Sequence, residues 1–131
     1  MKGVLHTDGA CLGNPGPMGL GIVLEREDGK EYTLSEPAGH GTNNIAEYSA
    51  LIRGLQLAQQ KDVTSINAYL DSQLVVEQVN GNWRVKDKTL AALHEKVQEL
   101  LAGFTEHTIE HVRREHNRRA DMLSKAAAER V

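Results

Sequence analysis

The residues best suited to chemistry are four acids from four separate segments of the 131-residue chain: Asp8, Glu47, Asp71 and Asp121. Carboxylate oxygens are the ligands that hard cations such as Mg²⁺ and Mn²⁺ prefer. Two such cations about 3.5–4 Å apart activate a water molecule and stabilise the leaving oxygen in an in-line displacement at phosphorus. If the fold brings the acids together, the sequence predicts hydrolysis of a phosphodiester with two Mg²⁺ ions, or with Mn²⁺ as a substitute.

Each acid taken alone has an ordinary structural explanation. Asp121 is expected in the first turn of a helix, where a negative charge interacts favourably with the helix dipole. Glu47 is harder to explain, because it shares a helix side with Leu51, and an ionised carboxylate near a core needs a partner. Divalent cations relieve the repulsion within a cluster of acids. The four acids together therefore favour a cation site.

The first part of the chain is expected to form strands. Residues 4–7 predict a strand that ends at Asp8, and the Gly- and Pro-rich residues 9–17 predict a loop. Residues 19–27 and 30–35 carry strand-forming side chains on either side of Asp28-Gly29, a dipeptide typical of a tight hairpin turn. Two antiparallel strands are expected there.

Helical periodicity begins after Thr42 and Asn43, either of which can serve as an N-cap. Residues 65–70 alternate as a strand does and lead to Asp71 and Ser72, where Ser72 can cap a second helix. A third helix is expected over residues 90–101, a last strand over 105–112 and a final helix capped by Asn117. The order β-β-β-α-β-α-α-β-α predicts an α/β fold with one mixed sheet, and it places Asp8 and Asp71 at the same edge.

The composition is that of one globular domain, residues 1–131, with 40% hydrophobic and 25% charged residues. No run approaches the roughly eighteen apolar residues of a membrane span, and the N-terminus lacks the apolar stretch of a secretory signal. Cys11 is the single cysteine, which excludes an internal disulfide and agrees with a reducing compartment. A cytoplasmic monomer without a membrane partner is expected.

The net charge of −3 argues, taken alone, against a nucleic-acid binder. A cluster of carboxylates becomes neutral or positive once metals bind, however, so the acidic excess can be local. Basic side chains gather in two clusters, Arg84/Lys86/Lys88 and Arg113/Arg114/Arg118/Arg119. A solvated surface explains each cluster as well as a nucleic-acid contact does.

Four segments resemble a known family. Residues 7–17, Thr-Asp-Gly-Ala-Cys-Leu-Gly-Asn-Pro-Gly-Pro, closely resemble the first signature of type 1 ribonuclease H. Residues 42–47 look like its second signature, residues 71–73 resemble its third, and residues 117–121 complete the set in the right order and spacing. The resemblance runs from about residue 4 to residue 128. It implies a ribonuclease H-like fold, a five-stranded mixed sheet with helices on both faces.

The same resemblance implies a function and a site. The function is sequence-independent, two-metal hydrolysis of the RNA strand of RNA–DNA hybrids, which leaves 5′-phosphate ends. The metal ligands would be Asp8, Glu47, Asp71 and Asp121. The residues that line the minor groove of the hybrid would be Gly9, Cys11, Asn14, Asn43, Asn44 and Gln73. Amide side chains suit this role, because RNA displays its 2′-hydroxyl groups in a wide, shallow minor groove. Helix capping by the two neighbouring asparagines and a small buried role for the cysteine are the alternatives.

Two features depart from the better-known family members. The loop before Asp121 is short, so the loop histidine that many relatives carry has no clean counterpart. The candidates for an auxiliary role are His116 and Glu115, with His111 a weaker one, and a plain surface role is the alternative for each.

The second departure is the stretch from residue 80 to residue 88, which lacks the large basic protrusion that some relatives use to grip the hybrid. Trp83 with Arg84 and Lys86 could still contact the DNA backbone. A tryptophan partly buried between helices is the more common situation.

Two rival functions are considered. The first is a nucleic-acid-binding module that keeps the fold without turnover, and the retention of all four acids speaks against it. The second is another nuclease or phosphoryl-transfer enzyme of the same broad fold that acts on DNA or on structured RNA instead of hybrids. The matches at Asn43, Asn44 and Gln73 disfavour this second rival, because they belong to the hybrid-reading part of the pattern.

Overall fold

The computed structural model describes residues 1–131 and contains one five-stranded sheet with four α-helices. The strands are β1 (Lys2–Cys11), β2 (Gly16–Arg26), β3 (Glu31–Gly41), β4 (Ser65–Leu70) and β5 (Glu106–His111). The helices are α1 (Asn43–Gln60), α2 (Gln73–Val79), α3 (Lys88–Leu101) and α4 (Arg118–Ala128), with a 3₁₀ turn at Arg114–His116. The element order predicted from the sequence is confirmed.

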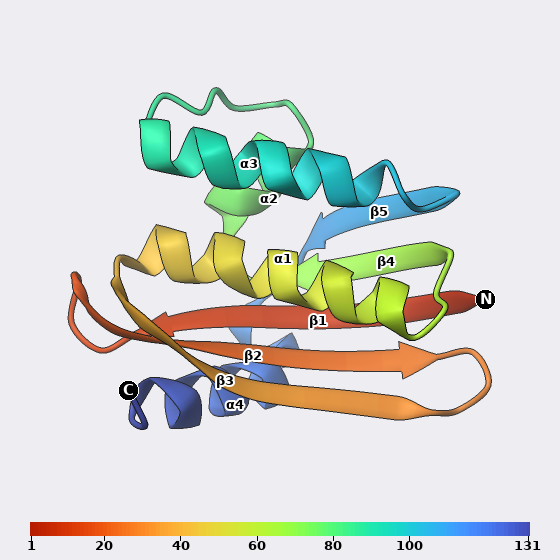
Figure 1. The fold of residues 1–131 in the computed structure, drawn as a ribbon, viewed down its shortest axis with the longest axis horizontal. Helices are drawn as coiled ribbons and strands as arrows, with labels where there is room; N and C mark the ends of the chain where they lie inside the picture. The colour runs from red at the N-terminus through yellow and green to blue at the C-terminus, as the bar shows by residue number, and fades with distance from the viewer.

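The sheet is mixed, with the strand order β3-β2-β1-β4-β5. Strands β1, β2 and β3 pair antiparallel, whereas β4 pairs parallel to both β1 and β5. Helix α1 packs on β1 and β2, and α2 and α3 lie on the same side (Figure 1). Helix α4 covers β1, β2 and β3 from the opposite side (Figure 1). The predicted α/β sheet with helices on both faces is therefore correct.

Two glycines of β2 let α4 lie directly on the sheet. A Cβ atom at Gly21 would lie 2.0 Å from the carbonyl oxygen of Ala120, and one at Gly19 would lie 2.0 Å from that of Ser124. Larger residues would push the helix away from the sheet. This close approach fixes the height of Asp121 and Ser124 above β1.

The predicted loop over residues 9–17 is wrong at both ends. Strand β1 continues to Cys11 and β2 already begins at Gly16, so the connection is only residues 12–15. Gly9 suggested a turn, but it lies in the strand because α1 comes so close: a Cβ there would lie 2.1 Å from the Ala46 carbonyl carbon. Strand β3 is also longer than predicted and ends at Gly41.

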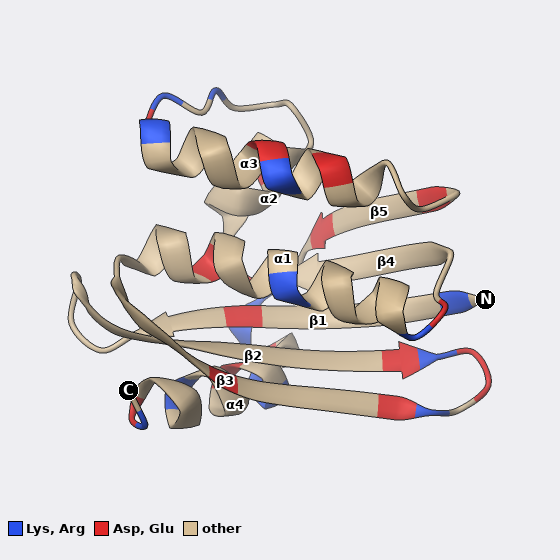
Figure 2. Cartoon of the chain, in the orientation of Figure 1, with Lys and Arg blue, Asp and Glu red and all other residues tan.

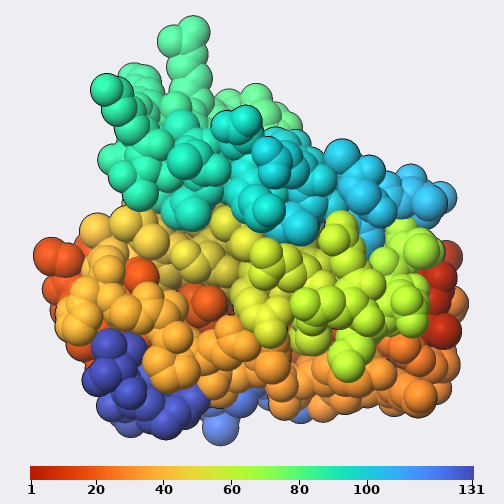
Figure 3. Space-filling view, viewed as in Figure 1, coloured from red at the N-terminus to blue at the C-terminus, as the bar shows by residue number.

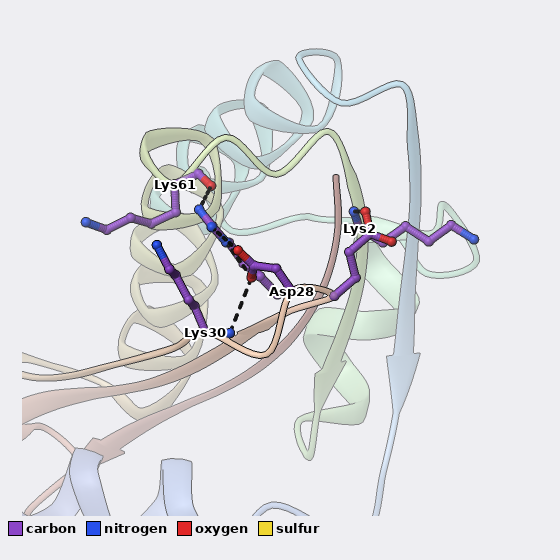
Figure 4. A network of polar contacts seen from close by, with 6 residues as sticks. Lys2, Asp28, Lys30 and Lys61 are labelled. Atoms are coloured by element: carbon purple, nitrogen blue, oxygen red, sulfur yellow. Dashed lines mark hydrogen bonds and ion pairs between the residues drawn. The ribbon is translucent and has the colours of Figure 1, made fainter.

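The hairpin between β2 and β3 turns at Asp28 and Gly29, as predicted, and Gly29 has the positive φ of +88° that the turn requires. The Asp28 carboxylate pairs with Arg26 and accepts from the Lys30 backbone N–H at 3.3 Å (Figure 4). The Arg26 guanidinium also donates to the Lys61 carbonyl at 3.0 Å, which ties the hairpin to the end of α1 (Figure 4).

Three helices have side-chain caps. Thr42 and Ser72 accept from the backbone N–H groups of Ile45 and Val75, each at 3.3 Å, so these two predicted caps are confirmed. Asp87 caps α3, a cap that the sequence reading missed. None of the helices combines the length and the apolar character that crossing a bilayer requires.

Asn117 does not cap α4 with its side chain, so this predicted cap is wrong. Asn117 occupies the N-cap position of α4 but makes no side-chain cap bond. Its Nδ2 donates instead to the Thr7 carbonyl at 2.9 Å. Because β4 ends at Leu70, opposite Thr7, this amide takes over where the sheet pairing stops. The contact fixes the backbone directly before Asp8.

Candidate metal and nucleic-acid site

Three of the four predicted acids meet at the point where β4 ends beside β1. Thr7 of β1 pairs with Leu70 of β4, so Asp8 and Asp71 follow at the same level. The start of α1 rests on Gly9, whose backbone N–H donates to Glu47 Oε1 at 2.8 Å. One oxygen from each of these three acids lies within 4.8 Å of the others. We call Asp8, Glu47 and Asp71 the carboxylate cluster.

The carboxylate cluster contains buried oxygens without a partner. Asp8 is 5% exposed and Glu47 is 8% exposed. Glu47 Oε2 and Asp71 Oδ2 are both buried and accept no hydrogen bond. Such atoms are rare in folded proteins, since a buried polar group that lacks a partner costs about 1–3 kcal/mol. An all-oxygen set with free lone pairs fits a hard divalent cation, and these three residues would hold it.

The carboxylate cluster also perturbs its own proton binding. Burial raises the pKa of Asp8 to about 7, and the negative charge of Asp71 adds to this rise, while the hydrogen bond from Ser124 opposes it. Burial together with the charge of Asp8 raises the pKa of Glu47 well above its usual range. A bound cation would favour the ionised forms. The electrostatics of the carboxylate cluster therefore favour the binding of a cation.

The structure does not place Asp121 in the carboxylate cluster. Asp121 lies in the first turn of α4, and its carboxylate pairs with Lys125 Nζ at 3.0 Å. Its carbonyl oxygen lies 2.8 Å from the hydroxyl of Ser124, and the same hydroxyl lies 2.5 Å from Asp8 Oδ2. Ser124 thus links the backbone of Asp121, and not its carboxylate, to the cluster, and the assignment of Asp121 as a metal ligand stays a prediction.

Ser124 is a site residue that the sequence reading missed. It is fully buried, with 0% of its surface exposed, and its hydroxyl contacts the carboxylate of Asp8. A signal was present in the sequence: Ser124 lies four residues after Ala120 and three before Ala127, so it is a polar residue within the apolar stripe of α4. A hydroxyl in such a stripe needs a partner, and here that partner is an acid.

Three of the residues assigned to the minor groove lie together. Asn14, Asn43 and Asn44 line one hollow of about 540 Å³ at the start of α1. The Asn43 backbone N–H donates to Asn14 Oδ1 at 3.1 Å, which holds the connection between β1 and β2 against the helix. Gln73 is exposed as the first residue of α2, directly after Asp71 and Ser72.

Gly9 and Cys11 have structural roles in the fold. Glycine is the only residue type that fits at position 9, because a Cβ atom there would collide with the backbone of Ala46. The Cys11 thiol donates to the Gly41 carbonyl at 3.2 Å and so ties β1 to the end of β3. Neither contact tests the predicted binding of nucleic acid, which stays a prediction for both residues.

The auxiliary candidates Glu115 and His116 differ in the hollows that they line. Glu115 borders a hollow of about 450 Å³ together with Asp121 and Met122. His116 does not line that hollow, but lines a smaller one of about 240 Å³ with His6 and Glu25, which Glu115 borders as well. Glu115 is therefore better placed than His116 to act near Asp121.

The connection between α2 and α3 exposes its aromatic and basic side chains. Trp83 is 44% exposed, so burial between helices, the more common situation for a tryptophan, does not apply here. Arg84, Lys86 and Lys88 are exposed as well. Figure 2 shows these positive charges along the connection and at the start of α3. We call residues 83–88 the basic segment.

The comparisons agree with this fold. A family model described as reverse transcriptase-like matches residues 6–127. The structure of RNase H1 from the archaeon Halobacterium salinarum superposes with a TM-score of 0.95 at 39% identity, over 100% of both chains. The N-terminal RNase H domain of a Mycobacterium tuberculosis protein gives a TM-score of 0.93 at 38% identity, over 98% of this chain and 99% of that one.

Among the curated proteins, a ribonuclease H of Syntrophus aciditrophicus is 38% identical over 148 residues, which cover 98% of this chain and 81% of that protein. Ribonuclease HI of Halobacterium salinarum is 42% identical, and the match covers 93% of this chain but 62% of that protein. A bifunctional protein of Mycobacterium tuberculosis is 40% identical, over 97% of this chain and only 35% of its own length. The fold and the carboxylate cluster thus define a ribonuclease H-like protein. The chain belongs to the ribonuclease H family.

Proposed function

We propose that this chain is an endonuclease that hydrolyses the RNA strand of RNA–DNA hybrids with two Mg²⁺ ions. The observation that carries the proposal is the carboxylate cluster, in which buried oxygens of Glu47 and Asp71 accept no hydrogen bond. A relative of known structure, LC11-RNase H1, has been solved in complex with an RNA/DNA hybrid. It is 34% identical and superposes with a TM-score of 0.86 over 98% of this chain and 97% of that one.

The site residues would have distinct roles in metal binding, in orienting the metal ligands and in proton transfer. Asp8, Glu47 and Asp71 would hold the metal ions, and Asp121 would complete the set from α4. When bound, divalent ions activate water and neutralise the charge that develops at phosphorus. Ser124 orients Asp8, and the Gly9 backbone N–H orients Glu47. Glu115 is the better placed of the auxiliary residues for moving a proton near Asp121.

Substrate selection would rest on the amides at the start of α1 and α2. Asn14, Asn43 and Asn44 share one hollow, and Gln73 lies exposed beside Asp71. Amides both donate and accept, so they can contact ribose 2′-hydroxyl groups without reading base identity. The expected result is cleavage that depends on the sugar and not on the sequence.

The test is a cleavage assay on three substrates of one sequence: the hybrid, duplex RNA and duplex DNA, each with Mg²⁺, with Mn²⁺ and with a chelator. Cleavage of the RNA strand of the hybrid alone supports the proposal, provided that Asp71→Asn loses the activity. Equal cleavage of duplex DNA would instead favour a general nuclease. Binding of the hybrid without cleavage would favour a non-catalytic module. The monomeric state and the cytoplasmic location stay predictions.

A further inference from the structure

A buried pair of side chains connects α1 to the segment between α2 and α3. Tyr48 is 0% exposed and Gln78 is 6% exposed. The Tyr48 hydroxyl donates to Gln78 Oε1 at 2.6 Å, and Gln78 Nε2 donates to the Arg84 carbonyl oxygen at 3.1 Å. A carbonyl oxygen only accepts, so the nitrogen of the amide must face Arg84. The Arg84 carbonyl therefore sets the orientation of the amide, and the Tyr48 hydroxyl holds the amide in place by donating to the oxygen that faces it.

The basic segment has few other attachments. At its start, the Trp83 backbone N–H bonds to the Glu77 carbonyl at 3.2 Å. Residues 84–86 make no other backbone hydrogen bond, and Val85 is the one half-buried side chain among them. The bond from Gln78 is thus the main polar restraint in the middle of the segment. Figure 3 shows side chains in this region projecting from the upper edge of the molecule.

The far end of this connection borders the proposed substrate site. Asp87, Thr89 and Leu90 line the same hollow as Asn43 and Asn44. In Figure 1 the start of α3 lies above the start of α1. Tyr48 directly follows Glu47 in α1. One helix therefore carries an acid of the carboxylate cluster, two amides of the hollow and the hydroxyl that restrains the basic segment.

We propose that Tyr48 and Gln78 are positioning residues that hold the basic segment in place to bind the phosphate backbone of the hybrid. The inference rests on the proposed function and adds to it a device for substrate affinity. Ordering a loose segment on binding costs free energy, and a segment that is already fixed avoids this cost. The pair acts through the segment, because both side chains are buried.

The test compares steady-state kinetics on the hybrid for Tyr48→Phe and Gln78→Met. Tyr48→Phe removes one hydroxyl group. Gln78→Met removes both hydrogen bonds of the amide while the side chain keeps nearly the same length. The expected result is a KM about 3–10-fold higher with an unchanged kcat, because binding is weakened and the chemistry is not. Hydrogen exchange of backbone amides 84–88 should become faster in both variants. Tyr32→Phe is the matched control, since its ring contacts Arg26 and Lys61 at the hairpin end and it should change neither quantity.

A double-mutant cycle shows whether the pair acts through the basic segment. In a protein with Arg84→Ala and Lys86→Ala, adding Tyr48→Phe should raise KM by less than about twofold, because the contacts that it positions are already gone. A full additive effect would overturn the inference, as would an unchanged KM in both single variants or a fall in kcat alone. Cleavage by the wild-type protein in the same experiment separates these outcomes from failure of the proposed function itself.

Discussion

The hydroxyl oxygen of Ser124 lies 2.5 Å from Oδ2 of Asp8, and both side chains are buried. The same hydroxyl lies 2.8 Å from the Asp121 carbonyl oxygen, yet it has only one proton to donate. An ionised Asp8 would receive that proton. A protonated Asp8 would donate to Ser124, which would then donate to Asp121. Ser124 therefore satisfies Asp8 in either state and fixes its orientation.

We predict that Ser124→Ala weakens metal binding and hybrid cleavage by about 10–100-fold, the size typical for loss of a residue that orients a metal ligand. The variant lacks only an oxygen, so the fold should persist. The measurements are calorimetric titration with Mn²⁺ and the cleavage rate in Mg²⁺. Ser124→Cys is the matched control of similar size with a weaker donor, and it should fall between the wild type and Ser124→Ala. Unchanged affinity in Ser124→Ala would show that Asp8 needs no such support.

We predict that Asp71→Asn abolishes hybrid cleavage without unfolding the protein. The change removes the charge of the side chain at constant size. The loss of cleavage should exceed the 10–100-fold expected for Ser124, which only orients a metal ligand, by about another tenfold or more. Cleavage is measured beside circular dichroism of the same sample. Near-wild-type activity in the folded variant would remove Asp71 from the set of metal ligands.

The stability of the metal-free protein should fall as the pH rises. The pKa of Asp8 is raised to about 7 from an ordinary 3.8, and that of Glu47 is raised in the same direction. A carboxyl whose pKa is higher in the folded state binds its proton more tightly there. Its contribution to the free energy of unfolding is fully present below about pH 4, which is near the pKa of the group in the unfolded state. The contribution is lost as the pH rises through about 7, the pKa in the folded state.

The check is thermal unfolding with a chelator from about pH 5 to about pH 8. Asp8→Asn should flatten this dependence and raise the Tm at pH 8 by several degrees, since a shift of one pKa unit is worth about 1.4 kcal/mol. Mg²⁺ should restore stability to the wild-type protein at pH 8, because it binds the ionised acids of the folded state. A Tm that does not change with pH in the chelator would contradict the prediction.

The topology could be predicted from the sequence because hydrophobic periodicity and turn chemistry agree along most of the chain. The hairpin at Asp28-Gly29 and the caps at Thr42 and Ser72 are local signals, and all three are confirmed. The predicted loop over residues 9–17 failed for a non-local reason. Gly9 lies in a strand because a helix passes over it, and local propensity carries no information about that helix.

The site was predictable to the extent that its residues are polar and mark the ends of elements. Asp8 and Asp71 each directly follow the last residue pair that joins β1 to β4, so the topology brings them together although β1 itself continues to Cys11. Asn117 looked like a helix cap, but its amide serves β1 instead, since the sheet pairing stops there. Contacts between side chains of distant segments, such as Tyr48 with Gln78, leave no periodic trace in the sequence.

We predict that Glu115→Gln slows hybrid cleavage more than His116→Ala does, with each effect smaller than that of Asp71→Asn. Glu115 borders the hollow of Asp121 as well as the hollow that His116 lines, whereas His116 does not line the hollow of Asp121. A side chain that assists proton transfer contributes less than a metal ligand does. The comparison is of kcat at saturating hybrid. Complete loss of activity in a folded His116→Ala protein would reverse this ranking.

The last prediction concerns how RNA is distinguished from DNA. If Asn14, Asn43, Asn44 and Gln73 contact ribose hydroxyl groups, removing those hydroxyls leaves amides unpaired, at a cost of about 1–3 kcal/mol for each group. Deoxyribonucleotides on either side of the scissile phosphate should therefore reduce cutting by roughly tenfold or more. Changing the base sequence of the hybrid should have a smaller effect than changing the sugar.

The measurement uses chimeric strands paired with one DNA strand, with a single deoxyribonucleotide moved along the RNA one position at a time. Cutting should fall only at the few positions next to the cleaved bond, because the amides lie at the starts of α1 and α2, beside Glu47 and Asp71. Replacing both Asn43 and Asn44 by alanine should make the enzyme less sensitive to the substitution at the position they contact, since the contact is already lost. Equal rates on the hybrid and on an all-DNA duplex would instead show that the amides do not read the sugar.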